Sequence, residues 1–139
     1  MKKTVTLAIL AAILSCPALF AQEQPLTPEQ REKKTREGID AAVAQYEKDL
    51  SLEVWQTFYV DSILTYNIGE RNKELESLAN NKVANMDIYT IVVDKWEEET
   101  YKAFRALLTD EQWNKYLKKG AGRAKKDRDK RAAKREENK

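Results

Sequence analysis

The side chains that could carry chemistry are mainly carboxylates and amines, because the chain has no histidine and a single cysteine, Cys16. Without histidine, general-base catalysis near neutral pH and zinc, copper or nickel sites lose their usual group. Glu97, Glu98 and Glu99 are the densest carboxylates, but consecutive residues of a helix point in different directions and do not converge on one atom. No phosphate loop, nucleophile elbow or dinucleotide fingerprint occurs. We therefore expect no enzyme, no cofactor and no metal site, and a solvated helix face at these glutamates.

Two near-identical pentapeptides have the features of helix starts. Residues 26–30 read LTPEQ and residues 108–112 read LTDEQ, so each has a threonine to cap the helix and a glutamine three residues later to bond back to the cap. Leu108 can also pack on Trp113 as a hydrophobic staple. A degenerate third copy, LEVWQ, occupies residues 52–56, where Glu53 replaces the threonine. We expect this replacement to remove the cap or to shift it to Ser51.

The elements that position these residues should all be helices. All three prolines lie at or before residue 28, and the rest of the chain is rich in Ala, Glu, Lys, Leu and Gln. Apolar spacing predicts helices from Thr27 to about Lys48, from near Ser51 to Gly69 or Asn80, from Asp87 to about Leu107, and from Thr109. The first should bury a thin stripe of Ile39, Ala42, Val43 and Tyr46. The second should be the main core contributor through Val54, Trp55, Phe58, Tyr59, Ile63 and Leu64.

The N-terminus has the order of a secretory signal peptide. Residues 1–21 carry two lysines, then an apolar run, then small residues up to Ala21, and the run is too short to span a bilayer. We expect cleavage near Ala21, export to the periplasm, and one helical domain from residue 22 to 119. A lipoprotein anchored at Cys16 is the alternative.

Charge is segregated along the chain. Residues 22–117 hold 12 Lys/Arg against 19 Asp/Glu, a net of −7, whereas residues 118–139 hold 11 against 4, a net of +7. Beyond Gly120 and Gly122 the only apolar residues are alanines, so we expect residues 120–139 to form a mobile or solvated-helical tail. Export and the lack of interleaved aromatic residues argue against nucleic acid as its partner. Anionic lipid or polymer, acidic clients or the protein's own acidic body remain as partners for Arg123, Lys125, Lys126, Arg128, Lys130 and Arg131.

Taken with export and an all-helical, cysteine-poor chain, the pentapeptides make the sequence resemble the LTxxQ-motif family of periplasmic stress proteins (Spy/CpxP-like). The resemblance implies a small all-α protein of long helices, in an antiparallel hairpin or cradle-like arrangement, that forms a homodimer. It implies an architectural role for the motif residues Leu26, Thr27, Gln30, Leu108, Thr109 and Gln112. Glu53 and the acidic body depart from the family pattern, and the acidic body leaves the attraction of clients to the basic tail.

The expected function is that of an ATP-independent chaperone or envelope-stress protein that captures unfolded envelope proteins on a helical surface. The alternatives are a regulatory or adaptor subunit that binds one specific envelope partner, and a structural envelope protein with a surface-binding basic tail. Aromatic side chains at helical spacing belong more often to the core than to a binding surface. The candidate client or dimer surface comprises Val54, Trp55, Phe58, Tyr59, Ile63, Tyr89, Trp96, Phe104 and Trp113.

Overall fold

The computed structural model describes residues 25–138, and these residues form helices without any strand. The predictions on the signal peptide, Ala21 and Cys16 lie outside this range. The elements, in chain order, are α1 (Pro28–Leu50), α2 (Val54–Asn80), α3 (Met86–Leu107), α4 (Asp110–Tyr116), the π-helical turn η1 (Leu117–Ala121) and α5 (Gly122–Glu137). None of these helices is long and apolar enough to cross a membrane.

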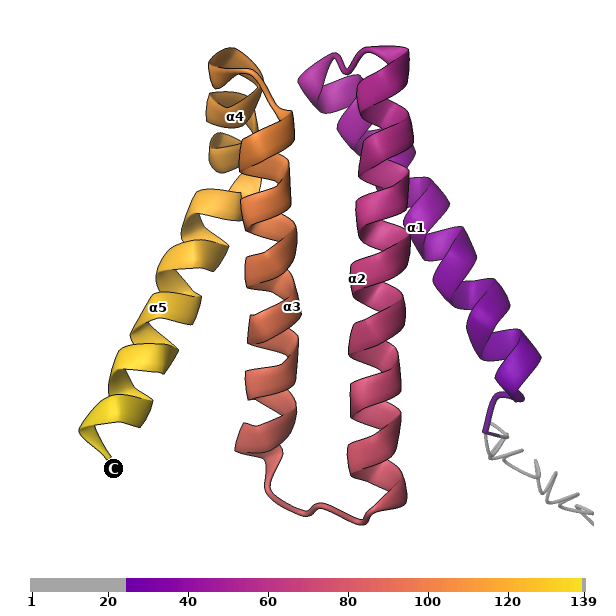
Figure 1. The fold of residues 1–139 in the computed structure, drawn as a ribbon, viewed down its shortest axis with the longest axis vertical. Helices are drawn as coiled ribbons and strands as arrows, with labels where there is room; N and C mark the ends of the chain where they lie inside the picture. Colours follow the sequence, from indigo (N-terminus) through magenta and orange to yellow (C-terminus); the bar gives the residue numbers. More distant parts are fainter. Residues whose placement is uncertain (1–24, 139) are drawn as a thin grey trace, which may run out of the picture.

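Figure 1 shows α2 and α3 side by side as an antiparallel hairpin, with α1 beside α2 and α5 beside α3. The α1–α2 and α3–α4 turns meet at one end of this hairpin, and the α2–α3 loop closes the other end. Between α4 and α5 the chain bends at Gly120, whose φ of 124° lies in the region that favours glycine. The predicted all-α class and antiparallel helical hairpin are confirmed.

The two pentapeptides start helices as predicted. Gln30 N–H donates to the Thr27 hydroxyl (3.2 Å), and Thr27 N–H donates to the Gln30 side-chain oxygen (2.9 Å). The same pair of bonds forms between Thr109 and Gln112, at 3.3 and 3.1 Å.

The third copy behaves differently from the prediction. The N-cap of α2 is Glu53, and its backbone N–H donates to the Gln56 side-chain oxygen (3.0 Å), so the cap has not moved to Ser51. Ser51 instead ends α1 in the left-handed conformation, at φ 53°. Glutamine at the third helical position therefore bonds back to the N-cap without a threonine there.

The core lies at the end of the hairpin where the two interhelical turns meet. Tyr46 packs edge-on against Phe104, with ring centroids 5.2 Å apart, and Phe104 contacts Tyr116 at the same distance. No apolar side chain between residues 65 and 103 is buried. The buried apolar residues of the described chain are Ile39, Leu50, Val60, Leu64, Phe104, Leu108 and Tyr116.

The predicted core face of α2 is confirmed at Ile63 and Leu64 but wrong for the residues near the start of the helix. Its buried residues are Gln56, Val60, Leu64 and Asn67, whereas the aromatic residues near its start are exposed. The buried amides are tolerated because both have partners: Gln56 bonds to Gln112, and the Asn67 amide donates to the Thr100 hydroxyl (2.9 Å). The helix is therefore rotated, relative to the expectation, towards its polar side.

Candidate functional site: an aromatic stripe and a basic helix

An aromatic stripe runs along the exposed side of α2. It consists of Trp55, Phe58, Tyr59 and Tyr66, which are 51%, 67%, 53% and 64% exposed. Their spacing of three, four, seven and eleven residues places them on one face of the helix. Phe58 and Tyr59 meet edge to face at 5.8 Å, and Trp55 meets Tyr59 at 6.2 Å. The rings are thus held by one another while much of their surface stays open to solvent.

Both ends of the stripe are anchored. The Trp55 indole donates to the Glu53 carboxylate (2.6 Å), so the residue that replaces threonine in the third motif copy also orients the first ring. Tyr66 packs edge-on against Trp96 of α3, with centroids 6.1 Å apart. These contacts restrict the rotamers of the outer rings and lower the conformational entropy that binding would remove.

The structure separates the predicted surface residues into two groups. Val54, Trp55, Phe58 and Tyr59 lie together on the exposed face. Phe104 is fully buried, and the others are half-buried: Ile63 and Trp113 pack against the core, Trp96 lies under Tyr66, and the Tyr89 hydroxyl bonds the Val83 carbonyl. Sequence reasoning missed Tyr66, although it follows Tyr59 by seven residues and so continues the same face.

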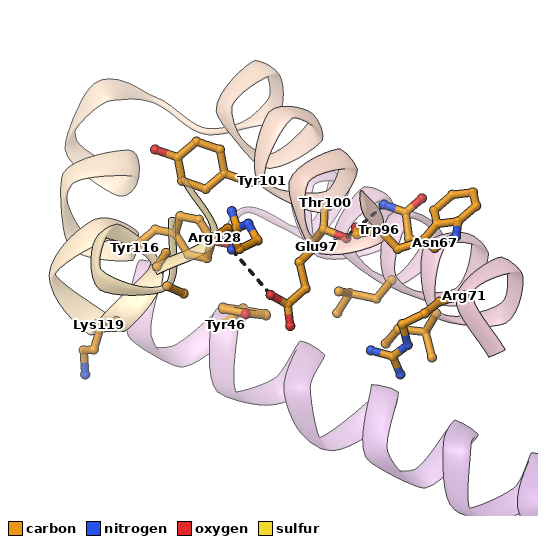
Figure 2. Close-up of a pocket in the computed structure, with 15 residues that line it drawn as sticks. Tyr46, Asn67, Arg71, Trp96, Glu97, Thr100, Tyr101, Tyr116, Lys119 and Arg128 are labelled. Carbon is orange, nitrogen blue, oxygen red and sulfur yellow. Dashed lines mark hydrogen bonds and ion pairs between the residues drawn. The ribbon is translucent and has the colours of Figure 1, made fainter. Parts of the chain in front are cut away.

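A cavity of about 360 Å³ opens between α1, α2, α3 and the η1–α5 bend (Figure 2). Its walls include Tyr46, Tyr101 and Tyr116, and burial raises the pKa of the Tyr116 phenol. Arg128 lies among them, and its Nε is buried without an acceptor among the described residues. Within residues 25–138 no group of three His, Cys, Asp or Glu side chains could hold a metal ion. The cavity presents aromatic walls, the cationic groups of Arg71, Lys119 and Arg128, and the carboxylate of Glu97.

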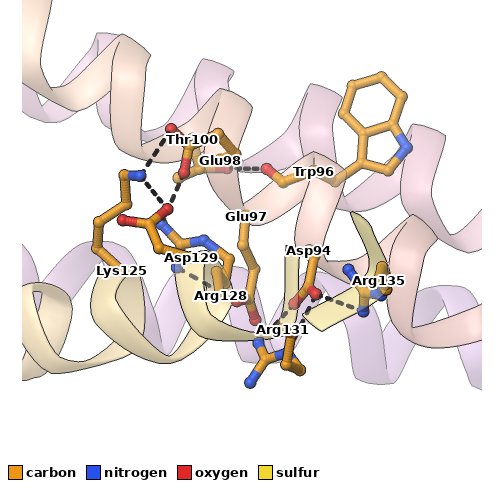
Figure 3. Close-up of polar contacts among 10 residues, drawn as sticks. All are labelled: Asp94, Trp96, Glu97, Glu98, Thr100, Lys125, Arg128, Asp129, Arg131 and Arg135. Atoms are coloured by element: carbon orange, nitrogen blue, oxygen red, sulfur yellow. Dashed lines mark hydrogen bonds and ion pairs between the residues drawn. The ribbon is translucent and has the colours of Figure 1, made fainter. Parts of the chain in front are cut away.

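Ion pairs hold α5 against α3 (Figure 3). Asp94, only 9% exposed, accepts hydrogen bonds from Arg131 Nε (3.1 Å) and Arg135 Nη2 (2.9 Å). Arg128 bonds Glu98 at 3.2 Å and Glu97 at 3.5 Å. Partial burial opposes ionisation of Asp94, but the hydrogen bonds from the two arginines outweigh it and lower the pKa of this carboxyl below its ordinary value.

This network corrects the expectation of a solvated glutamate face. Glu98 is half-buried beneath α5, whereas Glu99 stays exposed and pairs with Lys102 of its own helix (3.1 Å). Glu97 is exposed but reaches Arg128. A face that looks solvated in the helix alone is covered by the tail, because the tail brings charges of opposite sign.

The predicted tail cations divide between two faces of α5. Lys125, Arg128 and Arg131 make ion pairs with α3. Arg123 is exposed and pairs within α5 with Asp127 at 4.0 Å, while Lys126 and Lys130 are exposed without an ion pair in the described part of the chain. The helical form was one of two expected for this segment, and Arg135 is an additional contact that sequence reasoning did not single out.

The motif glutamines form a clamp between distant turns. Gln56 Nε2 donates to Gln112 Oε1 (2.8 Å), and Gln112 Nε2 donates back to Gln56 Oε1 (2.9 Å). Gln112 also reaches the Ser51 carbonyl at 3.4 Å. The α1–α2 turn is therefore tied to the α3–α4 turn, which positions the start of α2 and with it the aromatic stripe.

The chain matches no protein-family model, and neither curated proteins nor solved structures gave a significant match.

Proposed function

We propose that this protein is an exported, ATP-independent chaperone or envelope-stress protein that captures unfolded clients on the aromatic stripe of α2. The observation that carries the proposal is the exposure of the stripe: all four rings are more than half exposed on one face of one helix. Apolar residues scattered singly over a surface are ordinary, but a contiguous set marks a site of interaction.

The stripe suits a partner without a fixed shape. Trp55, Tyr59 and Tyr66 each combine a broad apolar ring with a polar tip, so they can contact many side chains without leaving an unpaired polar group. No enclosed pocket surrounds the stripe to select one residue, since its rings stand on the outside of the hairpin. Binding to such a surface is reversible and needs no nucleotide.

Two further features support the proposal. The helix starts at Thr27 and Thr109 each place a glutamine three residues on, which is compatible with the resemblance to the LTxxQ-motif family, whereas Glu53 departs from its pattern. The expected signal peptide at residues 1–21 would deliver the protein to an envelope compartment, where nucleotide-driven chaperones have no ATP supply.

The proposal is tested by the aggregation of several unrelated denatured proteins, followed by light scattering. The chain from Gln22 is used, because the expected signal peptide ends near Ala21. The wild type is expected to suppress scattering at about equimolar ratio. A variant with Phe58→Ser and Tyr66→Ser is expected to lose most of this activity without a loss of helicity, because both side chains are exposed.

A matched control replaces two other exposed apolar residues, Met86→Ser and Ile88→Ser, at the start of α3. This control should retain suppression if the aromatic stripe is the site. If the wild type leaves the scattering of every client unchanged, the general chaperone is rejected. An adaptor that uses the same stripe for one specific envelope partner then becomes the favoured function.

A further inference from the structure

Helix α5 has two basic faces that differ in their contacts. The inner face carries Lys125, Arg128, Arg131 and Arg135, and every one of them pairs with a carboxylate of α3. The outer face carries a lysine ridge, defined as Lys126, Lys130 and Lys134. All three ridge lysines are exposed, and their side chains have no ion pair or hydrogen bond within residues 25–138.

The ridge is unfavourable for the helix that carries it. Lysines four residues apart are neighbours on a helix surface, and like charges at this spacing destabilise it. The ridge spans eight residues, which is about 12 Å along the axis. Asp127 pairs with Arg123 and Asp129 with Lys125, and Glu137, which follows Lys134 by three residues, can offset one of the three charges. An excess of positive charge therefore remains available to an external anion.

The carboxylates nearest to α5 do not neutralise the lysine ridge. Asp94, Glu97 and Glu98, the carboxylates that lie directly beneath α5, are already matched by the cations of the inner face. Figure 1 places α5 at the outer margin of the molecule, on the side of α3 away from α2. The ridge can thus approach a flat surface without interference from the hairpin.

We propose that the lysine ridge docks the protein on a membrane leaflet rich in anionic phospholipid. This surface goes beyond the capture of clients, which uses the opposite part of the hairpin. The ridge is convex, and its only apolar neighbour is Ala133, so it offers a peptide neither a groove nor an apolar anchor. Contact is electrostatic and peripheral, and the helix does not insert.

The expected increase in binding constant is larger for an anionic leaflet than for an acidic peptide. An exposed ion pair with a peptide changes a binding constant by between roughly 1.4-fold and fivefold, because ordering two flexible side chains offsets the attraction, so three such pairs give between roughly threefold and a hundredfold. Near an anionic leaflet each lysine contributes roughly fivefold, and the contributions combine, so three lysines give roughly a hundredfold. A nucleic-acid duplex is less suited, since proteins that bind one usually neutralise about six to ten phosphates.

The test is co-sedimentation of the chain from Gln22 with phosphatidylcholine vesicles, with and without phosphatidylglycerol, at low salt. The test variant is Lys126→Gln, Lys130→Gln and Lys134→Gln. The charge-matched control changes the exposed α1 lysines, Lys33→Gln, Lys34→Gln and Lys48→Gln. The wild type and the control should bind only the anionic vesicles, and the ridge variant should bind them at least roughly tenfold more weakly.

Moderate salt should release the wild type from the vesicles, because exposed charges are screened. Unchanged helicity of the ridge variant by circular dichroism shows that α5 has not unfolded. Equal weakening by the ridge variant and the α1 control would overturn the proposal, since net charge alone would then account for binding. Tighter binding to duplex DNA than to anionic vesicles, at equal phosphate concentration, would also overturn it.

Discussion

Glutamines at the third position of a helix do two different tasks in this chain, and the difference between them can be measured as a difference in stability. Gln30 and Gln56 each accept a hydrogen bond from the backbone of their N-cap, but only Gln56 is buried and also bonds Gln112 across the fold. We predict that Gln56→Ala destabilises the protein by roughly 2–3 kcal/mol, because it removes the two hydrogen bonds to the half-buried Gln112 amide and the bond to the Leu107 carbonyl from a buried site. The matched change Gln30→Ala should cost less than about 1 kcal/mol.

Thermal unfolding of these variants, followed by circular dichroism, measures both effects. A double-mutant cycle with Gln112→Ala should give a coupling energy on the order of 1 kcal/mol between the two glutamines. Equal melting temperatures for the Gln30 and Gln56 variants would mean that Gln56 acts only as a local cap.

Individual residues also show which hydrogen bonds could be predicted from the sequence. The caps at Thr27 and Thr109 were predictable because donor and acceptor lie three residues apart. The clamp was not, because the partners of Gln56 lie 51 and 56 residues away. The same long-range bond explains why the prediction for the first turns of α2 was wrong: a satisfied amide occupies the buried position there, and the aromatic residues lie on the exposed side.

At the scale of elements, α5 is a helix docked by charge rather than by apolar burial. Its only apolar residues are alanines, and the contacts with α3 centre on Asp94. We predict that Asp94→Asn speeds amide hydrogen exchange in residues 122–137 by roughly tenfold or more, because both arginines lose their charged acceptor. The control Glu99→Gln, which pairs only within α3, should leave this exchange unchanged. A similar rate in both variants would mean that docking does not depend on Asp94.

The same carboxyl predicts a pH dependence of docking. Because the pKa of Asp94 is lowered in the folded state, its contribution is complete above the unfolded value, about 3.9, and is lost as pH falls through the folded value. Amide NMR shifts of α5 should therefore be constant between about pH 5 and 8 and should change below about pH 4. In Asp94→Asn this acid transition should be largely absent; its persistence at full amplitude would assign it to other groups.

The docking of α5 on α3 could not be predicted from the sequence, because the two helices are separated along the chain. The opposite charges of body and tail are visible in the composition, but their contact requires the bend at Gly120 to fold α5 back along α3. A glycine pair indicates a break in a helix and says nothing of its direction. The tail could thus be predicted as basic, and as either mobile or helical, while the side that meets α3 could not.

At the scale of the whole molecule, two apolar surfaces lie at opposite ends of the α2–α3 hairpin. The aromatic stripe begins at the end where the turns meet, and the exposed Met86, Ile88 and Ile91 lie beside the α2–α3 loop. Two separate patches allow one to close a homodimer while the other receives clients. We predict a light-scattering mass of two chains at tens of micromolar for the chain from Gln22.

The two double variants should then separate the two roles. Phe58→Ser with Tyr66→Ser is expected to lose client capture and keep the mass of two chains, because it alters only the stripe. Met86→Ser with Ile88→Ser is expected to shift the mass towards one chain and keep capture. If one variant changes both the mass and the capture of clients, a single surface serves for dimerisation and for capture. Capture per chain should then fall as the fraction of chains in the dimer rises. A wild-type mass of one chain would reject the dimer and leave both patches open to partners.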